Sequence, residues 1–203
     1  MALDAKKLVF EPIRVEDSVR IAPYFYRRPN KTCDSCALDS YLWAEYCDTR
    51  IAEWEDKALF ILMAKDGEQY TATPYCDEED LPQYFDLIKD YFNQVLKKPL
   101  KIYLADEEAV KYLHLEEDPR FIVREEEDYK DYLYDAEELR TLPGKRFHKK
   151  KNLVNKFKRE YEGRWEYRSI RCLEKQAVWD FLDRWYTHRI KEEGNGEETL
   201  EYE

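Results

Sequence analysis

Glycine is scarce in this sequence, at five of 203 residues: Gly67, Gly144, Gly163, Gly194 and Gly196. Loops that bind a pyrophosphate need glycines, because only a residue without a Cβ lets backbone N–H groups approach the phosphates closely. None of the five lies in an Arg/Gln-x-x-Gly-x-Gly/Ala sequence between a strand and a helix. The sequence therefore argues against a conventional glycine-rich phosphate loop.

Long apolar runs are also missing. The longest uninterrupted run is Ala58–Ala64, whereas a helix that spans a bilayer needs about 20 apolar residues. Lys6 and Lys7 lie near the N-terminus, but the apolar segment of a signal peptide does not follow them. We therefore expect no transmembrane segment and, by default, a cytoplasmic location.

Cysteine and histidine are too few and too scattered to indicate a metal site. The five cysteines are an odd number at irregular spacing, which favours reduced thiols. Cys33 and Cys36 form a Cys-x-x-Cys pair, but a zinc site needs two more ligands and no second pair follows. The simpler interpretation is that Cys36 packs at the entry of a helix. No metal is expected, and none of the three histidines can be assigned as a catalytic base: His114, His148 and His188.

Charge is abundant and unevenly distributed. The net charge is -11, but residues 1–143 carry 19 Lys/Arg and 33 Asp/Glu, whereas residues 144–203 carry 15 and 12. Eight of the 34 cations fall within residues 145–160. This change in composition is the clearest boundary signal in the chain.

Hydrophobic periodicity predicts a mixed α+β fold with a mainly antiparallel sheet flanked by helices. We predict a strand over 8–13, short helices within 15–26 and 39–47, and a three-strand meander over 50–55, 57–64 and 68–75. Further helices are predicted over 81–96, 107–115, 145–161 and 172–190, and further strands over 100–105, 121–125, 128–135 and 164–171. Asp80 is the expected N-cap of the helix over 81–96, and Gly163 the expected end of the helix over 145–161.

The helix over 145–161 is the candidate binding element. On a helical wheel its apolar residues fall in one arc, with amides and cations on and beside the opposite face. Such groups at turn spacing can hold a phosphate or carboxylate through charge-assisted hydrogen bonds. The alternative is the solvated face of an ordinary helix, although two asparagines, which are poor helix formers, favour binding. The candidate binding residues are Lys145, His148, Lys149, Asn152, Asn155, Lys156 and Arg159.

Two stretches together carry a resemblance to a known family. One has Cys33-Asp34 before an aromatic-rich helix, and the other has Tyr134-Asp135 followed by a Gly-Lys-Arg-Phe-His-Lys-Lys-Lys-Asn run over 144–152. They resemble the soluble bacterial family related to the C-terminal catalytic domain of phosphatidylglycerol lysyltransferases. Only Arg146 and Lys151 depart from the family's pattern, each exchanging one cation for another.

The resemblance implies two GNAT-like (acyl-CoA N-acyltransferase-like) domains. Residues 1–143 would form the first, and residues 144–203 would supply the basic helix with the first strand and helix of an incomplete second. It also implies an acyl- or aminoacyl-transferase-like protein, with acyl-CoA or aminoacyl-tRNA as the candidate donor. The small soluble relatives have no settled activity, so the fold carries over more readily than the reaction.

Two other functions stay open from the sequence. The chain is alternatively a non-catalytic binding or interaction module, in which the cations pair with acidic loops of the same chain. Binding of RNA such as tRNA is the third hypothesis, but the strongly negative first 143 residues would repel RNA. A narrow anionic small molecule or acyl donor suits this charge distribution better.

Overall fold

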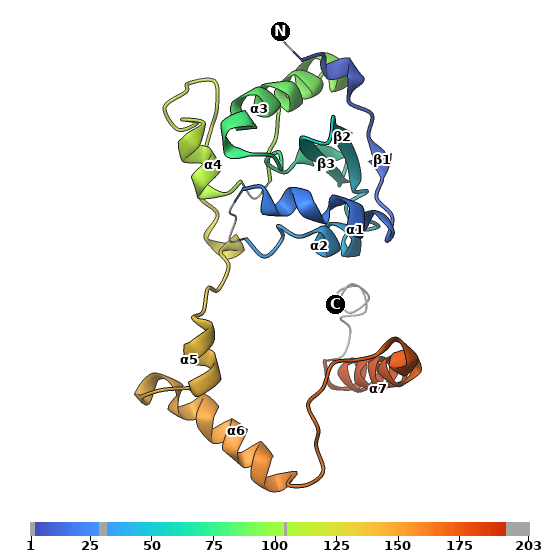
Figure 1. Cartoon of the computed structure of the whole chain (residues 1–203), viewed down its shortest axis with the longest axis vertical. Coiled ribbons are helices and arrows are strands. Elements are labelled where there is room, and N and C mark those ends of the chain that lie inside the picture. The colour runs from blue at the N-terminus through green and yellow to red at the C-terminus, as the bar shows by residue number, and fades with distance from the viewer. Residues whose placement is uncertain (1–2, 29–31, 104, 194–203) are drawn as a thin grey trace. The chain divides into compact units, whose positions relative to one another are not determined.

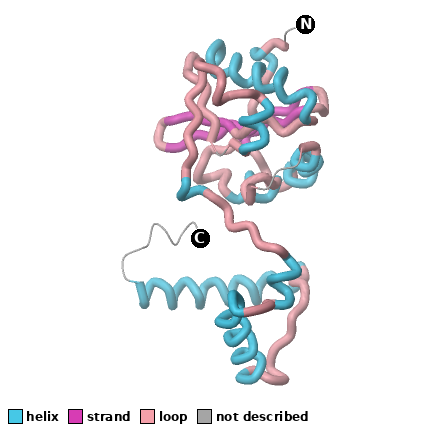
Figure 2. Tube along the Cα trace, turned by 90° about the vertical axis from the view of Figure 1, so that its left-hand side faces the viewer, coloured by secondary structure: helices cyan, strands magenta, loops and turns pink. Residues whose placement is uncertain are grey.

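The computed structural model describes residues 3–28, 32–103 and 105–193, and the chain divides into two compact units, Met1–Leu133 and Tyr134–Glu203 (Figure 1). The first unit holds an antiparallel sheet with helices on both faces. The described part of the second unit consists of helices and loops, as the colouring in Figure 2 shows. The predicted mixed α+β class with an antiparallel sheet is confirmed.

The sheet of the first unit has four strands in the order β1-β2-β3-β4, with every neighbouring pair antiparallel. Two tight turns close the predicted meander, and each places two residues at positive φ: Glu55 and Asp56 at 48° and 54°, and Asp66 and Gly67 at 53° and 78°. Such turns match the twist of the strands they join. The strands are β1 (Glu11–Pro12), β2 (Arg50–Trp54), β3 (Ala58–Lys65) and β4 (Glu68–Thr71).

Strand β3 contributes to both apolar clusters of the first unit. Its alternate side chains point to opposite faces of the sheet, and both faces are covered. Phe60 and Leu62 belong to one apolar cluster, and Leu59 and Ile61 to the other. Helix α3 (Leu81–Asp90) packs on the first face, and α1 (Asp17–Ile21) with α2 (Ala37–Leu42) lies on the second (Figure 1). The sheet is thus the middle layer of three.

The predicted helices of the first unit are present, with modified ends. Pro23 confines α1 to its first part, and a 3₁₀ helix (Ala22–Tyr26) follows. Helix α3 continues as a π-helix (Tyr91–Leu96), and α4 spans Glu107–Tyr112. Asp80 precedes α3, but its side chain accepts a hydrogen bond from the Gln83 side chain and caps no backbone N–H. Asp80 therefore occupies the predicted N-cap position of α3 but forms no capping hydrogen bond.

Several predicted strands are wrong. Residues 121–125 and 164–171 are loops, and residues 128–135 contain only part of a short 3₁₀ helix (Glu127–Tyr129). Within 100–105, of which residue 104 lies outside the described ranges, one parallel bridge joins Ile102 to Thr71. The strand over 8–13 is reduced to Glu11–Pro12. Alternating residues become a strand only where a neighbouring strand takes up the backbone hydrogen bonds, and these segments have none or almost none.

The second unit contains α5 (Ala136–Thr141), α6 (His148–Glu160) and α7 (Lys175–Glu193), with 3₁₀ turns at Lys145–Phe147 and Cys172–Glu174. Asp135 caps α5 by accepting the Glu138 backbone N–H at 2.9 Å. The predicted basic helix is confirmed, and Gly163 at a φ of 69° follows its end as expected. In the residues that the structure describes, no helix combines the length and the hydropathy that crossing a membrane requires.

Candidate anion-binding face on helix α6

The seven predicted binding residues lie on one short stretch of the second unit. Lys145 stands in the 3₁₀ turn before α6, and the other six are on α6 itself, with every side chain exposed. The structure brings His148 and Asn152 together, with the ring Nδ1 and the amide Nδ2 3.5 Å apart. The predicted face is therefore accessible along its whole length.

Few of the cations on this helix have an acidic partner. Arg146 pairs with Glu138, and the Lys156 Nζ lies 3.8 Å from a Glu160 carboxylate oxygen. The remaining six form no ion pair with any residue in the described ranges: Lys145, Lys149, Lys150, Lys151, Lys158 and Arg159. Three of these, Lys145, Lys149 and Arg159, belong to the predicted face and lack a counterion among the described residues, so the face is suited to an anionic ligand.

Aromatic side chains pack together on the apolar side of α6. Phe147, at the end of the 3₁₀ turn, is 4% exposed. Near the C-terminus of α6, the Phe157 ring stacks on Tyr161 at 4.9 Å between centroids and contacts Trp165 at 5.8 Å. These contacts orient the helix locally, so Lys149, Asn152 and Asn155 point away from the aromatic side.

The side chains of this face can bind an anion. Lysine ammonium groups, the Arg159 guanidinium and the asparagine amides can donate hydrogen bonds to phosphate or carboxylate oxygens. Because all of these side chains are exposed, their attraction for an anion is screened by salt.

The Cys33-Asp34 motif of the first unit forms a separate polar cluster. The Cys33 backbone N–H donates to Asp131 Oδ2 at 2.8 Å, and its Sγ lies 3.6 Å from Asp34 Oδ1. A hydrogen bond to Asp131, aided by partial burial and by the charge of Asp34, raises the pKa of the Cys33 thiol to about 12. The same hydrogen bonds lower the pKa of Asp131. At neutral pH the thiol therefore stays protonated, and a thiolate nucleophile is not formed.

Cys36 caps a helix instead of packing in the core. Its Sγ accepts the Asp39 backbone N–H at 3.3 Å at the start of α2, and its side chain is exposed. Cys33, Cys36, Cys47 and Cys76 are all unpaired, whereas the side chain of Cys172 lies outside the described set. The described residues contain no cluster of three or more His, Cys, Asp or Glu suited to a metal ion.

A buried ion pair was missed from the sequence. Arg28 Nη1 and Nη2 bind the Asp106 carboxylate at 2.6 and 2.9 Å, and the two side chains are only 5% and 3% exposed. Asp106 also caps α4 by accepting the Ala109 N–H at 2.8 Å. Nearby, burial raises the pKa of the Tyr75 hydroxyl to about 12. Asp106 could have been found as an N-cap, but its partner is 78 positions away.

The family model for "Phosphatidylglycerol lysyltransferase, C-terminal" matches residues 28–201. A crystal structure of a conserved protein of unknown function from Bacteroides thetaiotaomicron VPI-5482 superposes with a TM-score of 0.79 at 23% identity. The match covers 96% of this chain and 65% of that one, so this chain spans less than two thirds of its length. At this identity the likeness concerns the fold. No curated protein matches the chain.

Proposed function

The chain belongs to the family of phosphatidylglycerol lysyltransferase C-terminal domains, and from this premise we propose that it is an acyl- or aminoacyl-transferase-like protein. In this proposal α6 binds the phosphate of the donor or the acceptor. The proposal includes a GNAT-like fold, with the first domain over 1–143 and the start of a second over 144–203. It also includes a cytoplasmic location, which unpaired thiols support.

One observation carries the proposed binding site: six exposed cations on and beside α6 have no acidic partner among the described residues. Two of them, Lys145 and Lys149, also stand one helical turn apart. Like charges at this spacing destabilise a helix by about 0.2–0.5 kcal/mol per pair. A bound anion offsets that repulsion. A surface without a ligand would keep the destabilising repulsion with no compensating interaction.

Acyl-CoA and aminoacyl-tRNA are the two candidate donors, and both are anionic. A helix face with a few cations suits a ligand with few phosphates better than an extended RNA, because the first 143 residues carry a large negative charge. The sequence offers no glycine loop for the pyrophosphate. The side chains of α6 therefore bear the phosphate contacts in this proposal.

The test is isothermal titration of the full chain with acetyl-CoA and with aminoacyl-tRNA. The double variant Lys149→Ala/Asn152→Ala should bind the ligand about tenfold more weakly, because charge-assisted hydrogen bonds to the phosphate are lost. Its melting temperature should not change, since both side chains are exposed. Lys6→Ala/Asn93→Ala is the matched control, because it removes the same residue types from exposed positions of the first unit.

The outcomes separate the hypotheses. Equal affinity of the Lys149→Ala/Asn152→Ala variant and the wild type would remove α6 from the site. No binding of either ligand by the wild type would contradict the transferase proposal and leave a relationship of fold alone. Binding of tRNA without its aminoacyl group, with a steep dependence on salt, would instead favour RNA binding.

A further inference from the structure

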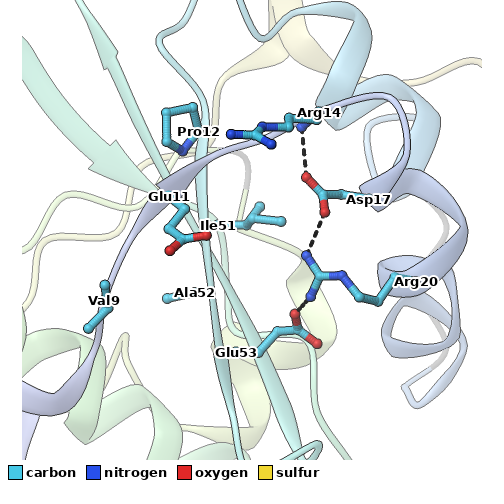
Figure 3. A pocket seen from close by; sticks show the side chains of 9 residues that line it. All are labelled: Val9, Glu11, Pro12, Arg14, Asp17, Arg20, Ile51, Ala52 and Glu53. Carbon is cyan, nitrogen blue, oxygen red and sulfur yellow. Dashed lines mark hydrogen bonds and ion pairs between the residues drawn. The ribbon is translucent and has the colours of Figure 1, made fainter.

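A cavity of about 460 Å³ lies in the first unit, where β1 and β2 meet the turn before α1 (Figure 3). None of its lining residues belongs to α6 or to the Cys33-Asp34 cluster. Ligand sites typically enclose about 300–1,000 Å³, so this cavity suits a small molecule. Most of its lining side chains are charged. The arrangement of these charges therefore indicates which kind of ligand the cavity binds.

Three of these charged side chains pair with one another along one wall, where Arg20 lies between two carboxylates and a net charge of -1 remains. Asp17 Oδ1 accepts from Arg20 Nη2 at 2.7 Å, and the other amino group of Arg20 pairs with Glu53. The Tyr24 hydroxyl donates to Glu53 at 2.9 Å, and the Arg14 backbone N–H donates to Asp17 at 2.8 Å. Each charged group of this wall already has a partner in the protein. The wall therefore shapes the cavity and does not need a ligand to pair its charges.

Two opposite charges in the cavity are not satisfied. The Glu11 carboxylate and the Arg14 guanidinium form no ion pair or side-chain hydrogen bond with any residue that the structure describes, including each other. Figure 3 shows Arg14 reaching from the turn before α1 towards β1, and Glu11 on β1 beside Ile51. One free anion and one free cation thus face the same small space.

The strand β2 adds a backbone donor and acceptor at the same place. Leu59 exchanges both of its backbone hydrogen bonds with Tyr75, each at 3.0 Å. Glu53 lies opposite Leu59 in the register, so its own N–H and C=O point away from β3, towards β1. However, β1 pairs only with Arg50 and Ile51. The N–H and C=O of Glu53 therefore have no backbone partner in the described part of the chain.

We propose that this cavity binds a free α-amino acid. Its carboxylate is held by the Arg14 guanidinium, and its ammonium group by the Glu11 carboxylate and the Glu53 C=O. The side chain contacts the apolar part of the lining, to which Val9, Pro12 and Ile51 contribute, which favours an aliphatic amino acid. This site is independent of the anion-binding face, because a free amino acid carries no phosphate.

Titration calorimetry of the full chain with L-leucine tests the proposal. N-acetyl-L-leucine lacks the ammonium charge and L-leucinamide lacks the carboxylate. Each should bind at least about tenfold more weakly than L-leucine, because one charge of the site is left unpaired. No binding of L-leucine at millimolar concentration, or equal affinity for all three ligands, would overturn the proposal.

Two variants locate the site. Glu11→Gln and Arg14→Gln should each weaken L-leucine binding about tenfold or more. Both side chains are exposed and unpaired, so the fold should persist. Lys7→Gln and Glu45→Gln change the same charges at exposed positions outside the cavity and should bind L-leucine normally. Normal L-leucine binding by Glu11→Gln or Arg14→Gln would contradict the assignment of the site. If a variant fails to fold, the comparison of the three ligands on the wild type still tests the proposal.

Discussion

The two units of this protein use their apolar residues differently. In the first unit, both faces of the sheet are covered, and Leu59 and Phe60 are at most 1% exposed. In the second unit, Leu153 on α6 and Phe181 on α7 are 67% and 56% exposed. Among the described residues, Phe147 is the one buried apolar side chain of the second unit.

The difference shows that a sheet provides two apolar faces on which helices can pack, which isolated helices do not. Each strand of the first unit presents two faces, and helices cover both, so one short segment such as β3 anchors two apolar clusters. The helix α6 is amphipathic, but its own unit contains no sheet among the residues described. Stability is therefore expected to concentrate in the first unit, and an accessible charged surface in the second.

The largest expected effect comes from breaking the buried ion pair. Arg28→Met leaves the Asp106 carboxylate buried without a cation, and should lower the free energy of unfolding by about 3–5 kcal/mol. Hydrogen exchange of the β3 amides measures this loss specifically for the first unit. Arg140→Met, which removes an exposed pair with Glu137, should cost about 1 kcal/mol or less and leave β3 protection unchanged. Equal effects of the two variants on β3 protection would contradict the expectation that the buried pair stabilises the first unit more than the exposed pair does.

A matched pair of core substitutions comes next. Leu59→Ala removes a fully buried side chain and should destabilise the first unit by about 2–5 kcal/mol. Leu153→Ala removes an exposed one and should change stability by about 0.5 kcal/mol or less. Urea denaturation followed by circular dichroism measures both. A large effect of Leu153→Ala would show that the apolar face of α6 is covered in solution.

The third prediction concerns the reactivity of Cys33. Because its pKa is raised to about 12 from an ordinary value of 9.0, its alkylation rate should keep rising with pH beyond 9, where an ordinary cysteine levels off. Asp131→Asn removes the main cause and should speed alkylation about tenfold at neutral pH if the pKa falls by about one unit. Mass spectrometry of the labelled Cys33 peptide measures the rate. Asp128→Asn, at an exposed position nearby, should have no effect.

The smallest effect is expected on α6 itself. Lys150→Glu/Lys151→Glu reverses two exposed charges without acidic partners, so stability should change by about 0.5 kcal/mol or less. Thermal unfolding of the full chain checks this. If the cations instead pair with acidic loops of the same chain, as the binding-module hypothesis holds, the melting temperature should fall clearly.

Prediction from the sequence succeeded where local signals suffice. The meander and its two turns were predicted because Asp66-Gly67 and Glu55-Asp56 interrupt alternating strands. The helix α6 was predicted because its apolar spacing and the following Gly163 are local features. The strand over 164–171 failed for the opposite reason, since alternation in sequence cannot provide the neighbour that a strand needs.

The sequence by itself determined the order of the main helices, the three-strand meander, the absence of a glycine-rich phosphate loop and the concentration of cations on one helix. These properties depend on residues within a few positions of one another. Only the tertiary structure decided that Arg28 meets Asp106, that Asp131 reaches Cys33, and that Glu11 and Arg14 share a cavity with the unpaired backbone of Glu53. The physical reason is that such contacts depend on which distant strands and helices pack together, and packing of the whole core selects that arrangement.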